Sequence, residues 1–268
     1  MVEGILLLAV MALALVLRAI PSIKNGHYGY DSYYHLLVAR TISERKRLPE
    51  KDTYMAPEGD YGYPPLLHVL LKPFAWKHEK FALRYLAPAI DTLTVLVAYG
   101  LACQLGVHHP ILIALIVAVS PMAVLQGASL SPRPLGNLAL SFAMFIAFVF
   151  WKTPDLRLIP FLVVSETLVM LSHKMSTQTL LVAHPAVSLA IMYYNPAEGL
   201  TVLLALPAAL ALAVLVTRGR YLTRVLKDHI GFIKVHTRHG DYVTGKKGLP
   251  SPIRSLKSDP LSFAGPFL

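Results

Sequence analysis

Seven apolar runs of nearly membrane-spanning length dominate this sequence of 268 residues. An α-helix rises about 1.5 Å per residue, so roughly 20 apolar residues cross the hydrocarbon core of a bilayer. Because lipid offers backbone groups no hydrogen-bond partner, such segments form helices. We therefore predict an all-α polytopic membrane protein with about seven transmembrane helices. The runs cover residues 1–20, 85–105, 110–126, 135–151, 158–171, 177–194 and 200–216.

Six spans are the alternative, because residues 172–176 alone separate the fifth run from the sixth. These two runs could be two short helices or one broken pair. The first run is longer than the apolar core of a signal peptide, which has about 7–15 residues. No small-residue cleavage site follows it, so we expect it to remain as the first span.

The composition excludes several other classes of protein. Hydrophobic residues make up 55% of the chain and charged residues 15%, whereas a soluble domain carries about 25% charged residues. A soluble enzyme, a disordered chain and a disulfide-built protein are therefore excluded. The single cysteine, Cys103, lies inside an apolar run, where we expect a small buried side chain.

One long polar segment, residues 21–84, interrupts otherwise short connections, and a loop of this length is usually functional. We expect residues 1–217 to form one transmembrane module with this segment as a large first outer loop. Residues 218–268 form a basic tail, either peripheral or a linker to a further region.

The tail holds ten Lys or Arg residues against three Asp, a net +7 of the chain's +10. A basic segment that follows a span is typical of contact with anionic lipid. No nucleic-acid-binding module accompanies it, so we expect no nucleic-acid partner. If Met1 is cytoplasmic, the loop and the tail both lie outside, which opposes the positive-inside tendency. The sequence leaves this orientation open.

The first loop carries the polar residues of greatest chemical interest. Residues 29–35 read GYDSYYH, and the pattern after Asp31 predicts a helix on the membrane surface. Asp31 and His35 are four residues apart and share a face of that helix. Asp31 could serve as an N-cap, as a functional carboxylate, or as both.

A second segment of the loop, residues 61–68, reads YGYPPLLH and predicts a helix started by proline over 66–74. A rigid loop whose tyrosines form an aromatic belt is the alternative. Asp52, Glu58 and Asp60 nearby are weaker candidates, better explained as solvated loop charges.

Together the two segments, with Ala39-Arg40 after the first, resemble the catalytic subunits of oligosaccharyltransferases, especially the archaeal ones. The wider group is the GT-C class of membrane glycosyltransferases. The resemblance covers roughly residues 1–216 and implies a seven-span module with a large first outer loop. It also implies a polyprenyl-phosphate-linked sugar donor and a protein or glycolipid acceptor.

The chain also departs from that family. Residues 127–137, where the family has a second acidic motif, contain Arg133 and no carboxylate. A tryptophan-rich motif is absent, since the two tryptophans are Trp76 and Trp151, and we expect the tail after Thr217 to be too short for the folded C-terminal domain of that family. The chain could be a small relative, an N-terminal portion of a larger enzyme or an inactive remnant.

Sugar transfer from a lipid phosphate requires a carboxylate that takes the acceptor proton or holds a divalent ion. We assign this role to Asp31 with His35 as its neighbour, and Mg²⁺ or Mn²⁺ is the ion that carboxylates would hold. Positive charge must stabilise the departing phosphate. Arg133, His173 and Lys174 are the candidate residues for this role. Alternatively, Arg133 is an ordinary interfacial arginine that contacts lipid head groups, and Lys174 extends its side chain to the membrane surface.

Three ionisable residues lie within or near the spans. Asp91 lies in the first turns of its span, where the helix dipole is sufficient to stabilise its charge. Glu166 could pair with His173, which lies two helix turns further along the chain. His184 with Pro185 indicates a kink. The leading hypothesis is a multi-pass glycosyltransferase of the cell membrane that acts at the outer face. A non-catalytic GT-C-like lipid-binding or assembly subunit is the alternative, and a transporter, which gains no support from internal repeats, comes third.

Overall fold

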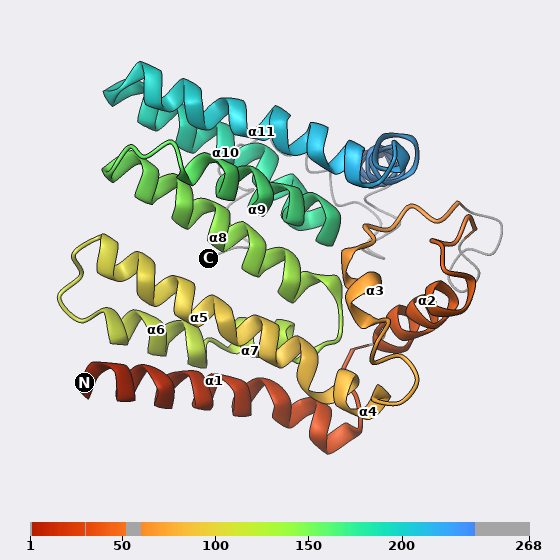
Figure 1. Cartoon of the computed structure of the whole chain (residues 1–268). Coiled ribbons are helices and arrows are strands. Elements are labelled where there is room, and N and C mark those ends of the chain that lie inside the picture. Colours follow the sequence, from red (N-terminus) through yellow and green to blue (C-terminus); the bar gives the residue numbers. More distant parts are fainter. Residues whose placement is uncertain (1, 30, 52–59, 239–268) are drawn as a thin grey trace.

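The computed structural model describes residues 2–29, 31–51 and 60–238, without the side chains of residues 232, 233 and 235–238. In this part every regular element is helical, and the long apolar helices run side by side (Figure 1). The elements of the bundle are α1 Val2–Asn25, α5 Ala87–Gln104, α6 Pro110–Val119, α7 Pro121–Ala128, α8 Pro132–Lys152, α9 Leu158–Ser172, α10 Lys174–Tyr194 and α11 Pro196–Val216. A multi-pass membrane fold is the arrangement that these helices support.

Five helices are long and apolar enough to cross a membrane, and a bent pair raises this number to six within the described residues. The predicted run 158–171 forms α9, which has 15 residues and falls short of that length. The predicted total of seven is therefore not confirmed. The run 110–126 is not one helix, because α6 and α7 meet at Ser120 with a bend of 58°. Pro121 explains the break: it lacks an N–H and disfavours helical geometry at the residue before it.

Small residues allow the helices to approach one another closely. Ala205, Ala209 and Ala213 line one buried stripe of α11, and Ala143 and Ala147 do the same on α8. In lipid, where apolar side chains gain little from contact with one another, such stripes are the usual means of helix association. The break between α9 and α10 falls at His173 alone, and α10 by itself is long and apolar enough to cross a membrane, so the two runs form separate helices.

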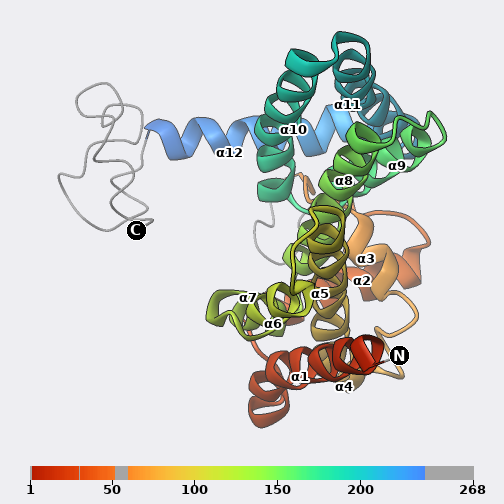
Figure 2. The same cartoon turned by 90° about the vertical axis from the view of Figure 1, so that its left-hand side faces the viewer.

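The long loop and the tail lie together at one end of the bundle (Figure 1). The loop contains α2 Ser32–Arg45, α3 Leu66–Leu71, α4 Glu79–Phe81 and the π-helical turn η1 Ala82–Leu86, which continues into α5. The predicted helices after Asp31 and after the proline pair are confirmed as α2 and α3, although α3 is shorter than predicted. The tail contains the π-helical turn η2 Tyr221–Leu226 and α12 Lys227–Arg238, which extends away from the bundle across its axis (Figure 2).

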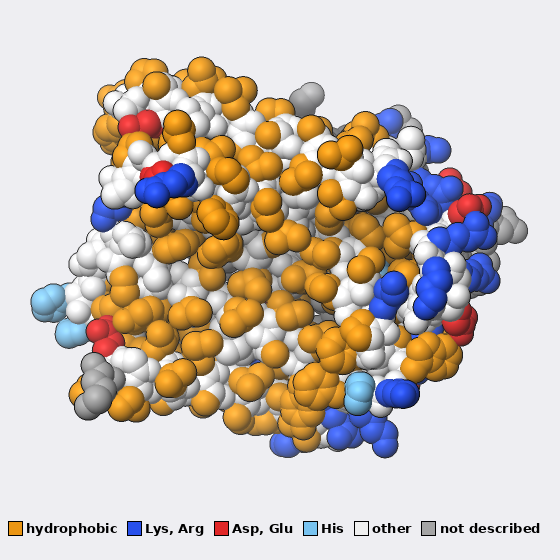
Figure 3. Space-filling view, viewed as in Figure 1, with side chains coloured by type: hydrophobic (Ala, Val, Ile, Leu, Met, Phe, Trp, Pro, Cys, Tyr) orange, Lys and Arg blue, Asp and Glu red, His pale blue; other side chains and the backbone are white. Residues whose placement is uncertain are grey.

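Most of the positive charge lies at this end, which we call the basic end (Figure 3). In the described part, Lys152 and Arg157 are the basic residues at the opposite end, and Arg18 lies inside the bundle. The loop, the tail and the neighbouring helix ends carry the others. The end that holds the candidate residues is therefore also the end that attracts anions.

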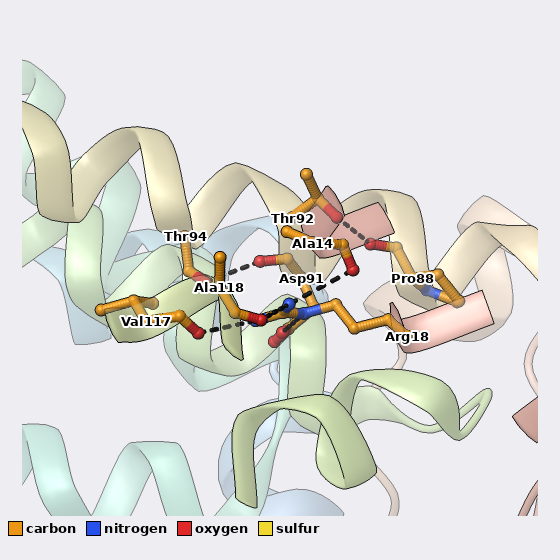
Figure 4. A network of polar contacts seen from close by, with 8 residues as sticks. All are labelled: Ala14, Arg18, Pro88, Asp91, Thr92, Thr94, Val117 and Ala118. Atoms are coloured by element: carbon orange, nitrogen blue, oxygen red, sulfur yellow. Dashed lines mark hydrogen bonds and ion pairs between the residues drawn. The ribbon is translucent and has the colours of Figure 1, made fainter. Parts of the chain in front are cut away.

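One buried polar network holds the bent span to its neighbours (Figure 4). Arg18 is fully buried and donates from Nε to Asp91 Oδ2 over 2.6 Å. It also donates to the carbonyls of Val117 (3.2 Å) and Ala118 (2.8 Å), in the last turn of α6. These carbonyls lie where the bend interrupts the helical ladder, so Arg18 supplies partners that the chain itself lacks. Asp91, expected to rely on the helix dipole, is held by an ion pair instead.

Glu166 and His184 form the second polar pair of the bundle. His184 Nδ1 lies 2.5 Å from Glu166 Oε1, both side chains are fully buried, and His184 Nε2 lies 3.0 Å from the Val202 carbonyl oxygen. The predicted pairing of Glu166 with His173 is therefore wrong. Pro185 lies inside a continuous α10, and the pair links α9, α10 and α11 rather than marking a separate site.

Arg18→Met should destabilise the protein strongly, because it leaves the Asp91 carboxylate buried without its partner. Breaking a buried pair from one side costs about 3–5 kcal/mol. Thermal unfolding in detergent measures the loss. Lys24→Met is the matched control, since Lys24 is exposed at the end of the same helix. Equal unfolding temperatures for the two variants would contradict the role given to Arg18.

Candidate functional site

A chain of hydrogen bonds fixes the two loop segments to each other. The Tyr61 hydroxyl lies 2.7 Å from His68 Nδ1, and His68 Nε2 lies 2.9 Å from His35 Nδ1. Tyr34 and Tyr63 pack their rings against both histidines. The two segments that the sequence singled out therefore form one packed unit that joins α2 to α3.

His35 is a buried part of this unit and not an exposed acid or base. Its side chain is 1% exposed, and burial, followed by the charge of His173, lowers its pKa to about 3. Burial likewise places the pKa of His68 well below the usual value, with His35 as the second cause. Both rings are neutral at physiological pH. His35 Nε2 is buried and has no hydrogen-bond partner among the described residues. His35 is therefore suited to positioning α2.

Asp31 differs from His35 although the two residues belong to one helix turn. It occupies the N-cap position of α2, but its side chain makes no cap hydrogen bond, and the residue is exposed. The interpretation of Asp31 as a helix cap is therefore wrong. Ser32 Oγ instead donates to the Tyr28 carbonyl over 2.6 Å and steadies the turn before the helix. The Asp31 carboxylate is therefore an exposed group with no cap bond among the described residues.

Two close backbone approaches bring the elements of the basic end together. Gly29 has φ +90°, and a Cβ built on it would lie 2.1 Å from Ser129 Oγ, so the segment before Asp31 packs against the α7–α8 connection. A Cβ on Gly136 would lie 2.6 Å from the Cβ of His173, so α8 packs tightly against the α9–α10 turn. A larger side chain at either position would force these segments apart.

Tyr63 lies among the charged candidates. Its pKa is raised to about 12, chiefly by burial and then by the charge of Asp31; Arg133 opposes the shift and Asp228 adds to it. The Lys174 ammonium lies 5.2 Å from the centre of the Tyr63 ring, a cation–π distance. Lys174 thus contacts this tyrosine ring, while Asp31 and Arg133 lie near enough for their charges to shift its pKa. Because Gly29 packs against Ser129, the starts of α2 and α8 lie together, and the predicted placement of Arg133 and Asp31 at the same end of the bundle is confirmed.

The three candidate phosphate ligands differ in their exposure and in whether another residue already pairs with them. Arg133 is exposed in the first turn of α8, and no described residue pairs with its guanidinium. His173 is buried, caps α10 by accepting from the Ser176 N–H over 3.4 Å, and has a pKa of about 4, lowered by burial and then by Arg133. Lys174 is ion-paired with Asp228 of the tail. Arg133 is thus the ligand most available to an anion, and His173 has a structural role.

Asp228 is the residue of this end that sequence reasoning missed. It lies in the tail, more than fifty residues from Lys174, and no local pattern indicated the contact. The weaker candidates Asp52 and Glu58 lie outside the described residues. Asp60 is exposed, and its backbone forms an isolated antiparallel β-bridge with Lys51. Among the described residues, no three His, Cys, Asp or Glu side chains are grouped as metal ligands.

The neutral histidines predict a stability that depends on pH. Because the pKa of His35 falls from 6.5 to about 3 on folding, its contribution is complete above pH 6.5 and is lost as the pH falls toward 3. The loss approaches about 1.4 kcal/mol per pH unit. His35→Gln, which cannot titrate, should flatten the fall of unfolding temperature between pH 6 and 4. His108→Gln, at an exposed histidine of the opposite end, should not. Parallel curves for His35→Gln and the wild type would contradict the assignment.

Comparison with known proteins adds one finding. The chain matches no curated protein. Residues 45–249 match a family described as "Predicted membrane protein (DUF2142)". The match begins at the last residue of α2 and includes α3, the bundle from α5 to α11 and the tail helix, which is well over half of the chain. The chain therefore belongs to the DUF2142 family of predicted membrane proteins.

Proposed function

We propose that this protein is a glycosyltransferase that moves a sugar from a polyprenyl-phosphate-linked donor to a protein or glycolipid acceptor at the basic end of the bundle. The observation that carries the proposal is the arrangement around Tyr63. An exposed carboxylate without a cap bond, Asp31, lies in this region with Arg133, which has no partner among the described residues, and with Lys174. A carboxylate beside fixed positive charge at a membrane surface is what transfer from a lipid phosphate requires.

The proposed reaction assigns one task to each of these residues. Asp31 accepts the proton of the acceptor group as that group bonds to the anomeric carbon of the sugar. The bond from this carbon to the phosphate oxygen breaks, and the lipid phosphate leaves with the electron pair. Arg133 and Lys174 stabilise the charge on the departing phosphate. His35, buried against His68, positions the helix that carries Asp31.

A divalent ion, Mg²⁺ or Mn²⁺, is part of the proposal only through Asp31. The described residues bring no third His, Cys, Asp or Glu to this place, and Asp228 is already paired with Lys174. These ligands do not form a metal site by themselves, so no step is assigned to a metal. If a chelator stops transfer and added Mg²⁺ restores it, the reaction requires a metal ion.

The membrane side of the reaction has two opposing indications. The resemblance to oligosaccharyltransferase subunits implies that the first loop lies outside the cell. The concentration of Lys and Arg at the basic end favours the cytoplasm by the positive-inside tendency. We propose the outer face, with the basic tail in contact with anionic lipid head groups.

A non-catalytic lipid-binding or assembly subunit is the second candidate function. The observation that favours it is the ion pair between Lys174 and Asp228, which occupies one of the two cations that a phosphate would need. Such a protein would bind the lipid-linked donor and present it to a partner. It would bind polyprenyl phosphate without transferring sugar.

Asp31→Asn should abolish transfer while the donor still binds, because an amide cannot accept the acceptor proton. Loss of a general base lowers the rate by about 10²–10⁴-fold. Transfer of radiolabelled sugar from a polyprenyl-phosphate donor pool, in matched membranes, measures this. Asp60→Asn, at another exposed carboxylate of the loop, is the control and should keep wild-type activity. If Asp31→Asn transfers normally, Asp31 has no role in the reaction.

Arg133→Gln should weaken donor binding by about 10–100-fold, the range that a charge-assisted hydrogen bond provides. Binding of a fluorescent polyprenyl phosphate in nanodiscs is the measurement. Arg45→Gln, an exposed arginine at the end of α2, provides the matched loss of charge. Equal weakening in both variants would show that Arg133 merely contacts lipid head groups.

Thiol labelling on intact cells tests the proposed outer face. In a Cys103→Ala background, Glu44→Cys at the basic end should react with an impermeant reagent, because α2 lies outside. Thr153→Cys at the opposite end should react only after the cells are opened. The reverse pattern would place the basic end in the cytoplasm and exclude transfer at the outer face.

A further inference from the structure

We propose that the tail helix α12 is a latch on the candidate site, in which the Asp228 carboxylate holds the place on Lys174 that the donor phosphate takes when it binds. The inference rests on the proposed function, since it concerns the regulation of the same site. It requires that phosphate and Asp228 compete for one ammonium group. The lipid phosphate therefore releases the tail, and the tail lowers the affinity for the lipid phosphate.

The tail is attached to the basic end by a series of contacts. After α11, Arg218 and Gly219 turn the chain with positive φ values of 52° and 81°. Tyr221 and Val225 then pack into the buried cluster formed with α9, α10 and α11. These contacts anchor η2 firmly at the start of the tail.

Two arginines attach η2 to the segment that follows α2. Arg220 Nη2 donates to the Pro49 carbonyl over 2.8 Å, and Arg224 Nη1 donates to the Glu50 carbonyl over 2.7 Å. The anchored turn thus fixes the direction in which α12 leaves the bundle (Figures 1 and 2). The first turn of α12 lies at the site as a result.

Asp228 in that first turn reaches the site directly. Its Oδ2 pairs with Lys174 Nζ, and the Lys174 ammonium lies 5.2 Å from the centre of the Tyr63 ring. A Cβ built on Gly62 would lie 2.4 Å from the Asp228 Cβ, so only glycine leaves room for Asp228 there. The loop segment next to Tyr63 is thereby shaped to receive a residue of the tail.

The neighbouring charges allow a phosphate to replace Asp228 as the partner of Lys174. Asp228 is the carboxylate on Lys174, while Arg133 near the same tyrosine has no described partner. A phosphate carries at least the charge of a carboxylate and offers more acceptor oxygens, so it could engage Lys174 and Arg133 together. The side chain of Asp228 is 45% exposed, so the carboxylate can move into solvent when it is displaced.

Binding of polyprenyl phosphate, the lipid without sugar, tests the latch separately from catalysis. Asp228→Asn removes the competing charge and should bind this probe about two- to fivefold more tightly, the range expected for a half-exposed ion pair. Glu44→Gln removes one exposed carboxylate from the same end and should bind like the wild type. In a Lys174→Gln background, Asp228→Asn should have no further effect.

Equal or weaker binding by folded Asp228→Asn would overturn the latch. Tighter binding by this variant in a protein that transfers no sugar would support the latch and reject the enzyme. Absence of binding by both the wild type and Asp228→Asn would overturn the latch as well.

The wild-type chain provides a second readout that needs no substitution. In nanodiscs of zwitterionic lipid, polyprenyl phosphate should speed tryptic cleavage after Lys227 and Lys234, because the released helix is more accessible. Neutral polyprenol should have no effect. Unchanged cleavage with polyprenyl phosphate would contradict the latch. So would an equal effect of phosphatidylglycerol at the same charge, because the tail would then respond to any anionic surface.

Discussion

The absence of water inside a bilayer is the constraint on which the rest of this structure depends. A polar group buried in lipid must find its partner within the protein. The bend at Ser120 leaves carbonyls of α6 without helical partners, and Arg18 satisfies two of them while Asp91 neutralises its charge. This network joins α1 and α5 to the bent span. The bent span, in turn, leads through a short connection to Arg133 in the first turn of α8 at the basic end.

The same constraint separates the bundle into two kinds of surface. The spans expose apolar side chains, and the charges of the described part concentrate at the basic end (Figure 3). There the buried polar side chains of the loop form hydrogen bonds with one another, from Tyr61 to His68 and from His68 to His35. Burial keeps these rings neutral, whereas Asp31, at the start of the same helix as His35, is exposed. The site is thus a solvent-facing carboxylate and arginine supported by a buried aromatic layer.

Local patterns predicted much of this fold. Apolar run length located the bundle helices, and the residues after Asp31 and Pro65 correctly predicted α2 and α3. The bend at Ser120 was missed although Pro121 was a visible signal, because the run was judged by its hydropathy alone. The cap role of Asp31 was wrong because residue type favours a cap without showing where the side chain points.

Long-range contacts could not be predicted in this way. Asp228 meets Lys174 only because η2 is anchored against α10 and α11, and the pairing of Glu166 with His184 depends on how α9 packs against α10. Arg18 and Asp91 likewise lie in different spans. Each of these contacts joins residues on different helices, so helical periodicity within one segment could not indicate it. Packing decides them.

The most direct test of the account is to locate a bound lipid phosphate on the protein. A polyprenyl phosphate with a photoreactive group beside its phosphate, crosslinked in nanodiscs and mapped by mass spectrometry, provides that location. The account predicts labelled peptides that contain Tyr63, Arg133 and Lys174, with labelling suppressed by unlabelled polyprenyl phosphate. Labelling confined to the opposite end, near Lys152 and Arg157, would contradict it.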